Sequence, residues 1–187
     1  MGLFFNKILL DDLYRYEGDQ NRSLRTKLKY LFLVPGFTFT FFYRHASMSK
    51  NRVTRLFWLF FFYLTRLITH IQIPLRTKIG NGLYILHFGP IIVNPEAIIG
   101  KNFCISSGCL VGDDRGKRAG TPVIGNNVYM GANSIIVRNV HIGNHVLLAP
   151  GAFVNFDVPN NSIVLGNPGK IIQREESPTD KHIIYQV

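Results

Sequence analysis

The chain has 187 residues and a formal net charge of +10, with 47% hydrophobic and 17% charged residues. This length is enough for one domain with its own core, and the composition excludes an intrinsically disordered chain. Two cysteines, Cys104 and Cys109, are too few for a disulfide framework or a four-ligand zinc site. No apolar stretch reaches about 18 residues, so we do not expect a membrane-spanning helix.

The positive charge is concentrated in the first half of the chain. Between Asp19 and Glu96 there are eleven basic residues and no acidic one. This balance favours an anionic partner such as nucleic acid, phospholipid or a phosphate-bearing substrate. The aromatic residues of the same region form contiguous blocks, as from Phe60 to Tyr63, whereas nucleic-acid platforms space single rings along a groove. We therefore do not expect a nucleic-acid partner.

Helices are the first elements that the pattern predicts. Their expected ranges are Leu24–Lys29, Thr38–His45 and Val53–Ile71, and Pro35-Gly36 is expected to break the chain between the first two. We assign residues 1–75 to an α-helical N-terminal region.

The last of these helices has an apolar run with basic flanks. Leu56 to Leu64 is apolar throughout, and Arg52, Arg55 and Arg66 bracket it. Such a pattern is typical of a helix that lies on an anionic membrane surface. Packing of the helices on each other, which would support assembly, is the alternative that the pattern leaves open.

Aliphatic residues recur every sixth position in the second half of the chain. Neither a helix nor an alternating strand explains this period, whereas a parallel β-helix does, because three six-residue strands make one triangular coil. The positions are Val93, Ile99, Ile105 and Val111, then, after an interruption, Ile124, Met130, Ile136, Ile142, Leu148 and Val154. We assign residues 76–172 to this β-helix and residues 173–187 to an exposed C-terminal tail.

One histidine stands out at the start of the repeat. It is His87, in the run from Ile85 to Gly89, and the sequence around it, from about Phe37 to Ile172, resembles the serine acetyltransferase family. The resemblance implies a mainly β fold, a left-handed parallel β-helix preceded by a small α-helical region. It also implies that His87 is the general base that takes a proton from a substrate hydroxyl as the hydroxyl attacks acetyl-CoA.

The other histidines are interpreted as structural or surface residues, and no metal is expected. They are His45, His70, His141, His145 and His182. No acid occupies the family's orienting position, so we expect Gln72 or a main-chain carbonyl to orient the His87 ring.

The resemblance also implies an acetyl-CoA groove between subunits of a homotrimer, with higher assembly through the N-terminal helices as a further expectation. Small residues in the groove would let the pantetheine arm approach the backbone, and a lysine would meet a phosphate. The matching positions are Gly131, Ala132, Ala149, Gly166 and Lys170. Ordinary packing between coils is the alternative explanation for each small residue.

The groups that recognise serine in this family differ here. Gln72 and Leu86 replace two acids, and Gly120-Thr121 replaces an Arg-His pair. Because an apolar or neutral residue does not supply the discrimination of a charge partner, we expect an acceptor other than serine.

An insertion interrupts the repeat and supplies a basic cluster. It spans residues 113–120 and contains Arg115, Lys117 and Arg118, which suit an anionic group on the acceptor or on coenzyme A. We expect this cluster, with Gln72 and Thr121, to bind the acceptor; a solvated loop without a ligand is the alternative.

The sequence thus predicts an acetyl-CoA-dependent O-acetyltransferase that modifies a saccharide hydroxyl in surface-polysaccharide biosynthesis. L-serine O-acetyltransferase of cysteine biosynthesis is the first alternative, and a non-catalytic β-helix scaffold is the second. We expect a cytoplasmic protein, with contact to the inner face of the cell membrane as a further expectation.

Overall fold

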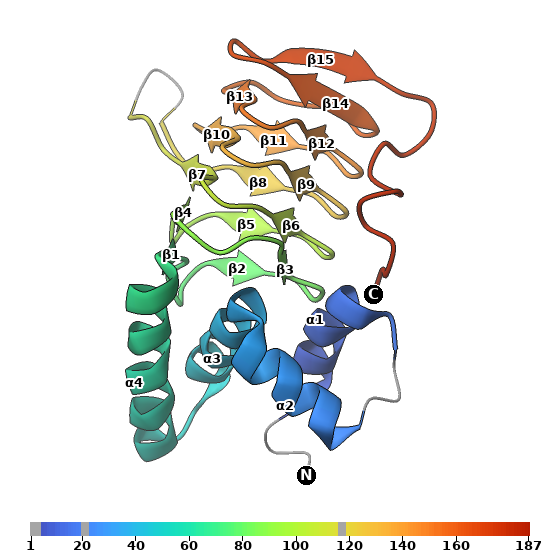
Figure 1. The fold of residues 1–187 in the computed structure, drawn as a ribbon. Helices are drawn as coiled ribbons and strands as arrows, with labels where there is room; N and C mark the ends of the chain where they lie inside the picture. The colour runs from blue at the N-terminus through green and yellow to red at the C-terminus, as the bar shows by residue number, and fades with distance from the viewer. Residues whose placement is uncertain (1–4, 20–22, 116–118) are drawn as a thin grey trace.

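The computed structural model describes residues 5–19, 23–115 and 119–187. Within these residues, four α-helices form one end of the molecule and a stack of short strands forms the rest (Figure 1). The helices are α1 (Lys7–Glu17), α2 (Leu24–Leu33), α3 (Pro35–Met48) and α4 (Arg52–Thr69).

Polar caps and one proline define where the helices begin. The Asn6 side chain accepts a hydrogen bond from the Leu9 N–H at 3.0 Å, and Asn51 caps α4 in the same way. Pro35, which the sequence pattern placed in a break, is instead the first residue of α3, where its missing N–H leaves no helical bond unmade. α1 was not predicted from the sequence.

The strands form the three faces of a parallel β-helix, which we call faces A, B and C. Face A has the order β1 (Ile71–Gln72), β4 (Ile91–Val93), β7 (Leu110–Gly112), β10 (Ile135–Val137) and β13 (Phe153–Val154). Face B has β11 (His141–Ile142), β8 (Val123–Ile124), β5 (Ile98–Ile99) and β2 (Lys78–Ile79). Face C has β15 (Lys170–Gln173), β14 (Ser162–Leu165), β12 (Leu147–Leu148), β9 (Tyr129–Met130), β6 (Cys104–Ile105) and β3 (Tyr84–Ile85). β14 and β15 pair antiparallel, whereas the other paired neighbours are parallel.

The aliphatic residues of the repeat form the core of the β-helix. All ten predicted positions are buried, with exposed fractions of 0–3%. Equivalent residues stack from coil to coil, as Ile99 on Ile124 and Ile105 on Met130. The residues that recur every sixth position are therefore the inward-facing residues of successive strands, as predicted.

A buried ion pair fastens the helices to the first coil. Arg44 of α3 donates to Asp12 of α1 at 2.8 Å and to the carbonyls of Ile79 and Gly80 at 2.8 and 2.7 Å. Asp12 also accepts from the Leu83 N–H at 2.8 Å. Because both charged groups are buried, these bonds hold the helical end in one position against the strands.

The C-terminal segment is not the exposed end that was expected. After β15 the chain runs back beside the coils and ends near α1 (Figure 1). Thr179 and Ile183 are 0% exposed, and the Val187 N–H donates to Asn102 at 2.9 Å. Arg15 of α1 donates to the Tyr185 carbonyl at 2.8 Å. The segment is polar enough to resemble a solvated tail, but Ile183 is buried on the protein, whereas its neighbour Ile184 is exposed.

None of the helices in the described residues combines the length and the apolar character that a membrane span needs. The division of the chain at residues 75/76 and 172/173 stays a prediction.

Candidate active site

His87 lies on an extended turn between β3 and β4, and its side chain is exposed. The register pairs Ile85 with Ile105 and Val93 with Val111. Because 93 is eight positions after 85, and 111 is six positions after 105, the turn with His87 has two residues more than the turn stacked on it. His87 therefore stands on the longer turn at the edge where face C meets face A, which we call the C/A corner.

The His87 ring has no hydrogen-bond partner in the described part of this chain. Among the described residues, neither Gln72 nor a main-chain carbonyl makes the expected hydrogen bond to this ring. Catalytic hydrogen bonds are often long or absent without substrate, so this geometry leaves His87 available as a base.

The residues predicted to bind acetyl-CoA lie in one column at the C/A corner. Gly131, Ala149 and Gly166 each directly follow a strand of face C, as Leu86 and His87 follow β3. Main-chain bonds link the levels: the Gly131 N–H donates to Leu148 O at 2.8 Å, and the Ala149 N–H donates to Val164 O at 2.9 Å. The fold thus aligns these residues above His87 along one edge.

Lys170 and Ala132 belong to the same end of face C. Lys170 pairs with Leu165 and is exposed, and Ala132 follows Gly131 and accepts from the Gly151 N–H at 2.9 Å. All the predicted acetyl-CoA contacts are therefore brought together.

Glycine is required at different positions of the column for different physical reasons. A Cβ on Gly131 would approach Pro150 N to 2.7 Å, so coil packing alone requires glycine there. At Gly166 the nearest atom to a Cβ would be 3.7 Å away, and its φ of +79° is what favours glycine.

A buried thiol supports this corner from inside. Cys109 donates to the Gly131 carbonyl at 3.2 Å and lies 3.5 Å from Ser134 Oγ. Burial raises the pKa of Cys109, so its thiol stays protonated and is a packing group rather than a nucleophile.

The predicted acceptor residues are not all brought together. Gln72 lies on β1 of face A and is exposed, whereas Arg115 and Thr121 lie between β7 and β8, where face A meets face B. Lys117 and Arg118 lie outside the described residues. Within one chain the insertion is therefore at a different corner from His87.

Two cavities were not foreseen from the sequence. One, of 410 Å³, lies at the junction of α4 and β1 and is lined by Tyr63, Arg66, Leu67, His70 and Gln72. His70 had been interpreted as a structural or surface residue. It lies beside Arg66 because it caps the end of α4, where its N–H donates to the Arg66 carbonyl.

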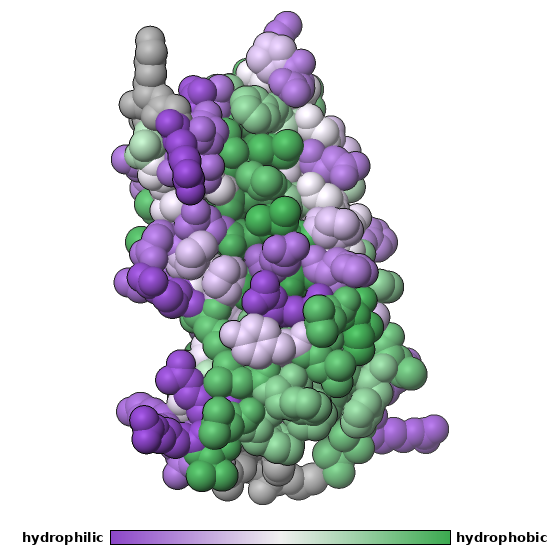
Figure 2. Space-filling model, turned by 90° about the vertical axis from the view of Figure 1, so that its left-hand side faces the viewer, coloured by the Kyte–Doolittle hydropathy of each residue, from purple (hydrophilic) through white to green (hydrophobic). Residues whose placement is uncertain are grey.

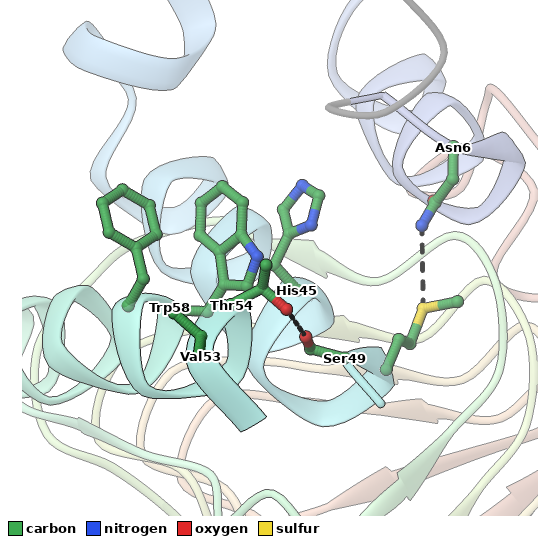
Figure 3. Close-up of a pocket in the computed structure, with 8 residues that line it drawn as sticks. Asn6, His45, Ser49, Val53, Thr54 and Trp58 are labelled. Atoms are coloured by element: carbon green, nitrogen blue, oxygen red, sulfur yellow. Dashed lines mark hydrogen bonds between the residues drawn. The ribbon is translucent and has the colours of Figure 1, made fainter. Parts of the chain in front are cut away.

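The second cavity lies among the helices and has 570 Å³ (Figure 3). Its lining comes from the residues before α1, the end of α3 and the start of α4, and includes His45 and Trp58, whose rings stack at 4.2 Å. This cavity is apolar and belongs to the helical end, so it is not the acyl-transfer site. In the described residues no group of three or more His, Cys, Asp or Glu side chains could hold a metal ion.

The sequence matches known proteins over most of its length. The family model described as "Bacterial transferase hexapeptide (six repeats)" matches residues 121–155. The chain is 30% identical over 172 residues to the serine acetyltransferase of Helicobacter pylori, covering 89% of this chain and 99% of that one. The chain belongs to the serine acetyltransferase family.

Other members agree with this assignment. The serine acetyltransferase of Synechococcus elongatus is 29% identical over 86% of this chain, which spans 66% of that protein's length. A solved structure of soybean serine acetyltransferase complexed with serine has a TM-score of 0.71 and 26% identity, and covers 88% of this chain and 68% of that one.

The family assignment confirms three predictions. The fold is a left-handed parallel β-helix with a helical N-terminal region, the enzyme class is acetyl-CoA-dependent O-acetyltransferase, and acetyl-CoA is the co-substrate.

The prediction of a saccharide acceptor and a polysaccharide pathway is wrong, because the matched relatives and structures are serine acetyltransferases. The prediction relied on Gln72, Leu86 and Thr121, which the resemblance aligns with charged groups of the family. The loss of a charge at one aligned position does not exclude the same chemistry from another element, and the sequence pattern could not show such a replacement.

Proposed function

We propose that this protein transfers the acetyl group of acetyl-CoA to the hydroxyl of L-serine, with His87 as the general base. In this reaction His87 takes the hydroxyl proton as the oxygen attacks the thioester carbonyl. The tetrahedral intermediate then expels the coenzyme A thiolate, and His87 returns the proton to sulfur. The serine acceptor comes from the relatives, and the position of the base comes from the geometry of this chain.

The observation that carries the proposal is the position of His87. It lies on the longer turn at the foot of the column formed by Gly131, Ala149 and Gly166. A thioester that reached this turn with its pantetheine arm along the column would meet the imidazole at the edge that is open to an acceptor.

The test is release of the coenzyme A thiol in the presence of serine. We expect His87→Ala to lower turnover by about 10²–10⁴-fold, the usual worth of a general base. The matched control is His141→Ala, because His141 is also exposed but lies on face B. Near-normal turnover of His87→Ala would contradict the proposed role, as would an equal loss in the control.

We further propose that the active site is completed in a homotrimer. Hexapeptide-repeat acyltransferases are typically trimers. In this chain the C/A corner is open, and the insertion with Arg115 lies at another corner, so a neighbouring subunit is needed to enclose both substrates. A mass of three 21.3 kDa chains in analytical ultracentrifugation is the expected result, and a monomer at working concentration would contradict it.

We also propose that α4 contacts an anionic membrane from the cytoplasmic side. Its outer face exposes eight large apolar side chains, visible as a broad hydrophobic surface over the helical end (Figure 2). They are Val53, Leu56, Phe57, Phe60, Tyr63, Leu64, Leu67 and Ile68.

Charge favours a membrane over a second copy of the same face. Arg52 and Arg55 lie beside the apolar face, and the nearest acids in the sequence are Asp19 and Glu96. Two such faces would bring like charges together, whereas anionic lipid supplies about 1 kcal/mol for each nearby cation.

Vesicle co-sedimentation tests the contact. We expect binding to vesicles with phosphatidylserine, and weaker binding by Arg52→Glu/Arg55→Glu, while Lys101→Glu, an exposed change on the β-helix, has little effect. Failure of the wild type to bind at low salt would contradict the contact. In that case a change of oligomeric state in Phe60→Ser would indicate that the face packs on a second copy.

A further inference from the structure

The cavity at the junction of α4 and β1 is lined by hydrogen-bond donors. It has 410 Å³, and its lining residues include Arg66, His70 and Gln72, whose side chains carry a guanidinium, an imidazole and an amide. Tyr63 and Leu67 complete the lining. The cavity is small enough to hold an amino acid or a group of similar size.

These donors have no partner of their own in the described structure. Within residues 5–19, 23–115 and 119–187, no ion pair or side-chain hydrogen bond involves Arg66, His70 or Gln72. The Arg66 guanidinium instead lies over the rings of Phe62 and Tyr63, 5.7 Å from each centroid. The rings restrict the side chain and leave its donors available, so the cavity suits an oxyanion.

One residue that lines the cavity, His70, is linked through its backbone to the end of the turn that carries His87. The register pairs Ile71 with Ile91, and the Ile91 N–H lies 3.4 Å from the His70 carbonyl that accepts from it. His70 therefore occupies the position below Pro90, three residues after His87 at the same C/A corner.

His87 thus stands between two candidate binding regions. The small residues from Gly131 to Gly166 rise on one side of it, and the cavity with Arg66 lies on the other. A thioester and an acceptor must approach a shared base from different directions. If coenzyme A follows the column, the cavity is on the side from which the acceptor enters.

We propose that Arg66, supported by His70 and Gln72, binds the α-carboxylate of the amino-acid acceptor. This inference rests on the proposed function, because it takes serine as the acceptor. A planar guanidinium matches a carboxylate with two parallel hydrogen bonds. In serine the carboxylate is two carbons from the hydroxyl, so the group that binds it must lie close to the base.

Under this assignment α4 supplies the charged group for the acceptor carboxylate, which the aligned positions of the repeat do not supply. Gly120-Thr121 offers no charged donor where family members have an Arg-His pair, and Arg115 is at the corner where face A meets face B. Arg66 and His70 supply the same two side-chain types from a different element. The acceptor specificity would then depend on the junction between helix and strand.

The experiment measures KM and kcat for serine and for acetyl-CoA in Arg66→Gln. We expect the KM for serine to rise by about 10–100-fold, the worth of a hydrogen bond to a charged group, with kcat and the KM for acetyl-CoA little changed. Ethanolamine, which keeps the amine and the hydroxyl but lacks the carboxylate, is expected to react equally with wild type and variant. Arg66→Lys, which keeps the charge, is expected to recover part of the loss.

The control is Lys101→Gln, because Lys101 is an exposed cation on the β-helix and does not line the cavity. An equal serine KM in the two variants would overturn the carboxylate site, and so would a rise only in the KM for acetyl-CoA, which would assign the donors to a phosphate. A wild type that releases no thiol with serine would instead overturn the proposed function. Thermal melting of both variants separates lost binding from lost folding.

Discussion

The coils and helix α4 use apolar residues in opposite ways. In the coils the repeated aliphatic residue is 0–3% exposed, because each coil stacks on the next. In α4 eight large apolar side chains are 41–76% exposed. A repeat supplies its own packing partner at a fixed spacing, whereas an amphipathic helix needs a partner that its own pattern does not identify.

The largest effect is expected where the two regions are joined. Arg44→Ala would leave the Asp12 carboxylate buried without its charge partner, and we expect a loss of about 3–5 kcal/mol in the free energy of unfolding. Urea denaturation followed by circular dichroism measures it. A loss below about 1 kcal/mol would mean that helices and coils are held together mainly by apolar contact.

A pair of substitutions compares the two regions directly. Met130→Ala in the core of the coils is expected to destabilise the protein by about 2–5 kcal/mol. Phe60→Ala on the exposed face of α4 is expected to change stability by no more than about 0.5 kcal/mol in the absence of a partner. Thermal and urea denaturation of both variants measure the difference. A comparable loss for Phe60→Ala would show that α4 is already covered in the free protein.

The C-terminal segment extends the comparison, because it covers face C with few apolar side chains. Ile183 is 0% exposed, and its truncation in Ile183→Ala is expected to lower stability by about 2 kcal/mol or more. The exposed neighbour gives the control, Ile184→Ala, with little expected change. Equal denaturation curves for the two variants would show that the segment does not pack stably on the coils.

The smallest effect concerns the thiols inside the coils. Burial raises the pKa of Cys104 from 9.0 to about 12, so we expect no alkylation by iodoacetamide at pH 8 in the native protein and full alkylation in urea. Since the folded pKa is raised, its contribution to stability is present below pH 9 and is lost as the pH rises toward 12. Rapid native labelling would show that the coils open more readily than their packing indicates.

The repeat and the base could be predicted from sequence for a simple physical reason. A coil of three six-residue strands places an inward side chain at every sixth position. The spacing from Ile99 to Val154 therefore predicts the β-helix directly. His87 was predicted to be the base because it stands at the start of that spacing in a motif that resembles the family's, and this role stays a prediction. The helices were found only in part, since the cap that begins α1 is a single asparagine, Asn6.

The sequence by itself thus determined the β-helix, the enzyme class and the position of the proposed base, because each depends on neighbouring residues or on a strict period. Only the tertiary structure decided that the C-terminal segment returns to α1, that the insertion is at a different corner from His87, and that Arg66, His70 and Gln72 line one cavity. These features depend on contacts between elements whose relative position is set by packing and by the buried Arg44–Asp12 pair. No local pattern in the chain encodes such contacts, so residue type alone did not show that these three side chains lie together.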